Sequence, residues 1–318
     1  MIYYFLLSIS AIIFAIQFIV TKLFQQKNGN GIIASIILSL IGYLTIALFF
    51  FIKGSIVNKQ INIGFSWFTF LIGIAIAVVS FLQIFTSVKV LEIGDMSLYS
   101  VFLEIGNILF PSLTGMIFYN ESHSLLKIIA LSIMIIAVIV SGFGVKTGKI
   151  TIKAFVLYLF CMILNGLLGV FFTIHQNHPE LSASPIKNNG IYTVNNDMFL
   201  MWLGITTVLV SSLLLIVTLL VNRKKNNANK SNFNLSSLKW LLFIPVLYGL
   251  CNGLGNYLIA ISTEPSALGS SVTFPIVDGG VIALSTLVGV ILYKEKLSIS
   301  KIVSIVLVIT SCVLFLFI

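Results

Sequence analysis

The sequence predicts an all-α integral membrane protein with ten transmembrane helices arranged as two inverted five-helix repeats. Three observations lead to this fold class. Of the 318 residues, 58% are hydrophobic and 8% are charged, whereas a soluble domain carries about 25% charged residues. Apolar stretches recur at a length that spans a bilayer. A sequence pattern in the first half also returns in the second half. The first two observations indicate that lipid is the solvent for most of the chain.

Ten apolar stretches are the expected spans, because a hydrocarbon core of roughly 30 Å needs about 20 apolar residues in a helix. They lack the short alternation of barrel strands, and helices satisfy their own backbone hydrogen bonds. Lysines follow the first stretch and do not precede it, so we expect a retained helix rather than a signal peptide. The expected spans are 2–20, 31–52, 66–88, 96–119, 125–144, 154–174, 197–221, 239–261, 267–293 and 300–318.

An internal repeat relates the two halves. FYNESHSLLKI begins at Phe118, and LYKEKLSISKI begins 174 residues later at Leu292 (292 − 118 = 174). Identities at this offset extend over two predicted helices, which indicates duplication. Because the unit has five helices, its second copy is expected to cross the membrane in the opposite direction. The expected repeats are 1–146 and 147–318, the second with a polar loop at about 175–196. The identities include Ser97/Ser271, Gly106/Gly280, Gly115/Gly289, Tyr119/Tyr293, Glu121/Glu295 and Lys127/Lys301.

Two carboxyl residues lie in the middle of predicted spans. Glu104 and Asp278 differ by 174 residues, so they occupy equivalent places in the two repeats. A charge at the bilayer centre costs about 2.5–3.5 kcal/mol on insertion scales, and intramembrane ionisable residues are therefore functional candidates. We predict that they bind substrate or couple its movement to protons. The alternative is a protonated carboxyl that is hydrogen-bonded to a neighbouring helix.

Other polar residues extend this candidate site. On the fourth span, polar residues at steps of three or four, from Ser97 to Thr114, form a stripe on one helix face. Pro275 is expected to free a backbone carbonyl inside the ninth span, where kinked or broken helices often build transporter sites. The amides on other spans have an alternative role as interhelical contacts worth about 0.6 kcal/mol each. The site is expected between spans one, three, four, six, eight and nine. Its predicted residues are Glu104, Asp278, Asn107, Ser100, Gln83, Asn252, Asn256, Gln17 and Asn165.

The charges in the loops predict an orientation. With the N-terminus outside, fourteen of the eighteen lysines and arginines fall in cytoplasmic loops, including the segment 222–230, and four fall outside. The positive-inside rule then places both termini outside a plasma membrane. The net charge of +9 follows from these loops, so we do not expect a nucleic-acid partner. Glu121 and Glu295 fall at helix ends, where we expect them to cap helices or pair with lysines.

Sequence signatures of catalysis are missing. There is no P-loop, HExxH, GxSxG or CxxC pattern. The pair His175 and His178 lacks a clear third ligand for a metal. We therefore expect a protein that is not an enzyme, with no catalytic residues, no metal and no cofactor.

The phrase Gly-x-x-x-Tyr-x-Glu ends the fourth helix of each half, as GMIFYNE (115–121) and GVILYKE (289–295). With ten spans in two halves, the chain resembles the drug/metabolite transporter superfamily and its EamA-like branch. The resemblance implies a secondary active transporter, in the direction of export, for small organic metabolites such as amino acids or cationic drugs. The loop at 175–196 is longer than the family's usual linker. The alternatives are a facilitative uniporter, a membrane-embedded lipid-modifying enzyme and a non-transporting sensor. We expect a monomer, with a homodimer as the alternative.

Overall fold

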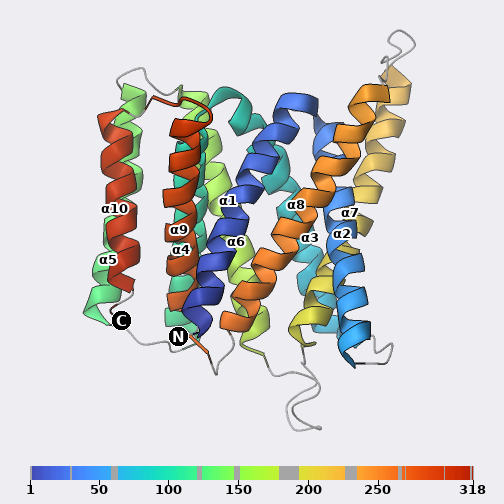
Figure 1. The fold of residues 1–318 in the computed structure, drawn as a ribbon, viewed down its shortest axis with the longest axis horizontal. Coiled ribbons are helices and arrows are strands. Elements are labelled where there is room, and N and C mark those ends of the chain that lie inside the picture. Colours follow the sequence, from blue (N-terminus) through green and yellow to red (C-terminus); the bar gives the residue numbers. More distant parts are fainter. Residues whose placement is uncertain are drawn as a thin grey trace.

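The computed structural model describes a bundle of long helices (Figure 1). It covers residues 2–28, 31–58, 64–119, 124–146, 151–178, 193–225, 235–263, 267–268, 270–296, 298–315 and 317. All the regular elements in these ranges are helices, and none is a β-strand. They are α1 (Ile2–Asn28), α2 (Ile32–Asn58), α3 (Trp67–Ile93), α4 (Met96–Phe118), α5 (Leu125–Lys146), α6 (Ile152–Gln176), α7 (Asn196–Lys225), α8 (Leu235–Ser262), α9 (Ser270–Ile291) and α10 (Ile299–Phe315).

Eight of these helices are long and apolar enough to cross a membrane. Within the fully described residues, the apolar parts of the other two helices, α5 and α10, are Leu125–Val140 and Ile299–Phe315. Large apolar side chains such as Leu213, Ile216 and Leu220 on α7 are more than half exposed. Because water does not favour such a surface, these side chains are placed to contact lipid hydrocarbon. The prediction of a helical membrane protein is confirmed.

The helices alternate in direction, and α1 begins at the same end of the bundle at which α10 finishes (Figure 1). The central helix α4 packs against α6 and α9, and α1 packs against α8 and α9. Further pairs are α2 with α7, α3 with α6 and α7, α2 with α8, and α5 with α10. These pairs follow the repeat. If each helix is exchanged for its counterpart in the other half, so that α1 becomes α6 and α6 becomes α1, the same nine pairs are obtained.

Glycines allow two of these helix pairs to approach closely. A Cβ atom added to Gly106 on α4 would lie 1.9 Å from the carbonyl oxygen of Met162 on α6. A Cβ added to Gly280 on α9 would lie 2.8 Å from the Cβ of Ala11 on α1. Small residues at such points are typical of membrane helix packing. Gly106 and Gly280, which the repeat relates, therefore do the same thing: each lets its helix approach a neighbouring helix closely.

Gly106→Ala is expected to push α4 away from α6 and lower the stability of the protein. The added methyl meets backbone that cannot rotate aside, and overpacking of this kind typically costs about 1–3 kcal/mol. The measurement is the thermal unfolding temperature in detergent. Gly31→Ala is the matched control, because nothing lies within 4 Å of its added Cβ. Equal unfolding temperatures for the two variants would contradict this account of the α4–α6 contact.

The N-terminus of α4 is capped from the other half of the chain. Glu295, in the loop after α9, accepts hydrogen bonds from the backbone N–H of Met96 at 2.6 Å and of Ser97 at 3.1 Å. It also accepts one from the Ser97 hydroxyl at 2.7 Å. The expected capping role of Glu295 is confirmed. Glu121 lies outside the described residues.

An ion pair and a hydrogen bond add to this junction at the same end of the bundle. Lys301 on α10 pairs with Asp95, the residue before α4. Lys22 on α1 donates to the carbonyl oxygen of Leu91 on α3. Elements from both halves of the chain are thus tied together where α4 begins.

The prolines inside two of the helices do not interrupt them. Pro275 lies inside α9 and Pro111 inside α4, yet both helices continue through the proline. The expected position of Pro275 inside the ninth span is confirmed, and the helix is continuous there. Much of the two polar loops cannot be compared, since residues 179–192 and 226–234 lie outside the described ranges.

Candidate substrate cavity

A cavity of about 100 Å³ lies between the helices. A buried water needs roughly 10–15 Å³ of such space, so several waters or one small solute would fit. Its wall comes from α1, α3, α4, α6, α8 and α9, the six expected spans. Tyr43 on α2 and Leu203 on α7 also contribute. Among the described residues of α5 and α10, none lines the cavity.

Eight of the nine candidate residues line this cavity, and they come from six helices, α1, α3, α4, α6, α8 and α9. Ser100 is the exception. Its hydroxyl donates to the Ser97 carbonyl at 2.9 Å and accepts from the Ser285 hydroxyl at 2.6 Å. Ser100 therefore joins α4 to α9 beside the cavity, and the stripe on α4 is a packing face along most of its length. The lining candidates are Gln17, Gln83, Glu104, Asn107, Asn165, Asn252, Asn256 and Asp278.

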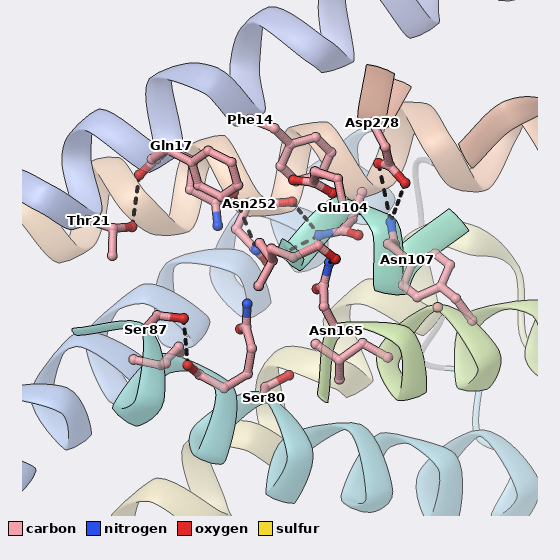
Figure 2. Close-up of a pocket in the computed structure, with 18 of the residues that line it drawn as sticks. Phe14, Gln17, Thr21, Ser80, Ser87, Glu104, Asn107, Asn165, Asn252 and Asp278 are labelled. Carbon is pink, nitrogen blue, oxygen red and sulfur yellow. Dashed lines mark hydrogen bonds between the residues drawn. The ribbon is translucent and has the colours of Figure 1, made fainter. Parts of the chain in front are cut away.

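The two intramembrane carboxyls meet at the α4–α9 contact. Glu104 is 5% exposed and Asp278 is 2% exposed, and their side chains interact directly. The Asn107 amide donates to the two carboxyl oxygens of Asp278 at 3.3 and 3.0 Å (Figure 2). The two carboxyl residues, which the repeat offset of 174 relates, therefore lie together although they belong to opposite halves of the chain.

The wall contains no basic side chain. None of the lining residues, all within the described part of the chain, is a lysine, arginine or histidine. Two carboxylates in contact repel each other in a medium of low dielectric. Their shared site is therefore best satisfied by a proton or by a cation that enters the cavity.

Amides form the rest of the polar wall, and some of them already bond within the protein. Asn165 donates to the Leu103 carbonyl at 3.0 Å, which ties α6 to α4. Asn256 donates to the Asn252 carbonyl at 2.9 Å. Asn252 reaches the Gln17 amide oxygen only at 3.5 Å, a long contact. The amides thus serve partly as interhelical contacts, and they leave hydrogen-bonding capacity directed at the cavity.

Aromatic and hydroxyl residues on the wall were not predicted individually. They include Tyr99, whose phenol donates to the Ser87 hydroxyl at 2.7 Å, and Ser80. With 26 phenylalanines and 10 tyrosines spread through the apolar spans, nothing in the spacing marks the ones that face inward. The remaining aromatic lining residues are Phe14, Phe18, Tyr43, Phe172, Tyr248 and Phe274.

Comparisons with known proteins identify the fold but no activity. No protein-family model matches the chain, and no curated protein sequence matches it. Twenty-eight chains of solved structures match its fold. One, described only as "Crystal structure of protein", is 12% identical, aligns over 98% of both chains and has a TM-score of 0.60. At this identity, the likeness concerns the arrangement of helices alone.

Proposed function

We propose that the protein is a secondary active transporter of small organic solutes that works by alternating access, and that it belongs to the drug/metabolite transporter superfamily. One observation carries the proposal. Two carboxyls from equivalent positions of a sequence repeat meet in a polar cavity, and that cavity lies inside a bundle of membrane helices. Intramembrane carboxyls of this kind typically mark substrate or proton pathways.

The helix pairing supports an inverted-repeat arrangement. Helices five places apart run in opposite directions, and the nine helix pairs named above are unchanged when the halves are exchanged. Along the α4–α9 contact, Ser100 bonds Ser285 while Asn107 bonds Asp278, so the two helices are antiparallel. A substrate site at the interface of inverted repeats is typical of secondary transporters, because rocking of one half against the other exposes it to either side.

The carboxyl pair gives a route for coupling. In the proposed cycle, a proton occupies the Glu104–Asp278 pair while the cavity is open to one side. A cationic solute entering from the other side replaces that proton, which leaves to the water there. Solute and proton therefore compete for one site and cross in opposite directions. In a uniporter, the same pair would bind the solute without exchange of a proton.

The polar groups favour a transporter over a lipid-modifying enzyme. The cavity's carboxyls and amides lie at the middle of the helices, away from the helix ends where lipid headgroups would reach. The basic side chains gather at the end of the bundle where α4 begins, including Lys22, Lys27, Lys153 and Lys301. We propose that this end faces the cytoplasm of a plasma membrane and that the direction of transport is export.

The test uses purified protein in liposomes that contain a pH-sensitive dye. Amines, amino acids and sugars are added outside one at a time, and internal pH is recorded. We expect at least one solute to change the internal pH in protein-containing vesicles and not in empty ones. If labelled solute enters without any pH change, the protein is a uniporter. Absence of both solute uptake and proton flux across the panel would contradict a transport function.

A further inference from the structure

We infer that the cavity binds a small organic cation, namely a short alkylammonium that carries a neutral hydroxyl or amide group. This inference rests on the proposed function and deepens it by naming the substrate class. The geometry points to it through three features of the described wall: its charge, its aromatic surface and its size.

The charge of the wall selects a cation over a zwitterion. Glu104 and Asp278 converge, and the side chain that donates to both oxygens of Asp278, the Asn107 amide, is neutral. A primary ammonium would donate charge-assisted hydrogen bonds to both carboxyls. An amino acid would bring a carboxylate as well, and the wall offers no basic side chain to pair with it. Burying that unpaired charge is strongly unfavourable.

The apolar part of the wall selects an organic cation over a metal ion. No group of three or more histidines, cysteines and acidic residues forms a metal-binding cluster within the described ranges. Phe14, Phe18, Phe172 and Phe274 line the same cavity as the carboxyls. Aromatic faces attract organic cations and cover their methylene groups, whereas they offer no ligand atom to a hard metal ion.

The volume of the cavity limits the size of the cation, and further polar groups on the wall indicate which other group the cation carries. A cavity of about 150 Å³ holds a benzene molecule of six heavy atoms, so about 100 Å³ suits a cation of roughly four to six heavy atoms. The buried hydroxyl of Ser80 on the wall makes no hydrogen bond of ordinary length within the described residues, although the Tyr43 phenol lies near it. Gln17 and Gln83 line the wall too. A hydroxyl on the cation would satisfy such groups.

The experiment measures binding without transport. Thermal unfolding of the detergent-purified full chain is followed with 2-aminoethanol, ethylene glycol, glycine, tetramethylammonium chloride and sodium chloride at matched ionic strength. A ligand that binds the folded state raises the unfolding temperature. We expect 2-aminoethanol to stabilise the protein with an apparent Kd at least about tenfold below those of the other four. Tetramethylammonium is the informative comparison, because it has a similar size and charge but no N–H.

Variants locate the binding. Asp278→Asn and Glu104→Gln keep the side-chain shapes and should each weaken the 2-aminoethanol effect at least about tenfold. Asp197→Asn is the matched control. That carboxyl pairs with Lys53 at 2.5 Å, does not line the cavity, and should leave the apparent Kd within about twofold. Equal binding to wild type and both cavity variants would overturn the inference.

The outcomes separate this inference from the proposed function. Selective binding of 2-aminoethanol without any flux in liposomes would support the inference and contradict transport. Flux of an amino acid or a neutral solute, without binding of 2-aminoethanol, would support transport and overturn the inference. Stabilisation by sodium ion that equals or exceeds that by 2-aminoethanol would also overturn it, as would no stabilisation by the amine.

Discussion

Asp278→Asn and Glu104→Gln are each expected to reduce solute-dependent proton flux in liposomes about thirtyfold or more. Removing the carboxylate that pairs with a bound cation typically costs about 2–5 kcal/mol, and 2 kcal/mol corresponds to about thirtyfold. Each amide keeps the size of the carboxyl it replaces but cannot exchange a proton. The measurement is the initial rate of internal pH change on solute addition, at equal protein content.

These variants should remain folded, because each change removes a repulsion between two carboxyls. Their unfolding temperatures in detergent are expected to match or exceed that of wild type. Asp197→Asn makes the same carboxyl-to-amide change at a pair with Lys53 outside the cavity and should retain wild-type flux. Full proton flux in the Glu104→Gln, Asp278→Asn double variant would remove both carboxyls from the mechanism.

Glu295→Ala is expected to lower the stability of the protein by about 2–3 kcal/mol. Its carboxylate accepts three hydrogen bonds at the start of α4. Hydrogen bonds to charged groups contribute about 1.5–3 kcal/mol each, with part of the loss recovered by water. A negative charge at a helix N-terminus adds a favourable interaction with the helix dipole. The measurement is thermal or denaturant unfolding in detergent.

Two further variants separate the cap from the loop that carries it. Glu295→Gln keeps an acceptor oxygen and should fall between Glu295→Ala and wild type. Lys296→Ala changes an exposed neighbour in the same loop and is expected to shift stability by less than about 0.5 kcal/mol. If Lys296→Ala and Glu295→Ala proved equally stable, the cross-half cap would have no energetic role.

The helices were predictable because the bilayer constrains them strongly. Each apolar stretch of the right length lies in a helix. The apolar pattern of a span does not show how far its helix continues into polar residues. For this reason the predicted span ended at 221, whereas α7 reaches Lys225.

Part of the site was also predictable. Glu104 and Asp278 were found because a charge in an apolar span is conspicuous and because the repeat offset relates them. Ser100 was misplaced on the cavity wall, since helical spacing gives the face of a residue but not which neighbour covers it. The capping of α4 by Glu295 joins residues almost 200 positions apart. The sequence signalled only that Glu295 lies at a helix end.

The central claim is that the cavity carries a solute alternately to the two sides of the membrane, and substrate counterflow tests it most directly. Liposomes are loaded with an unlabelled solute, diluted into the same solute at a trace labelled concentration, and followed over time. An alternating-access carrier should transiently accumulate label inside above its equilibrium level, and the Glu104→Gln, Asp278→Asn double variant should not. Label that only equilibrates, or that fails to enter for every solute that binds the protein, would contradict the account.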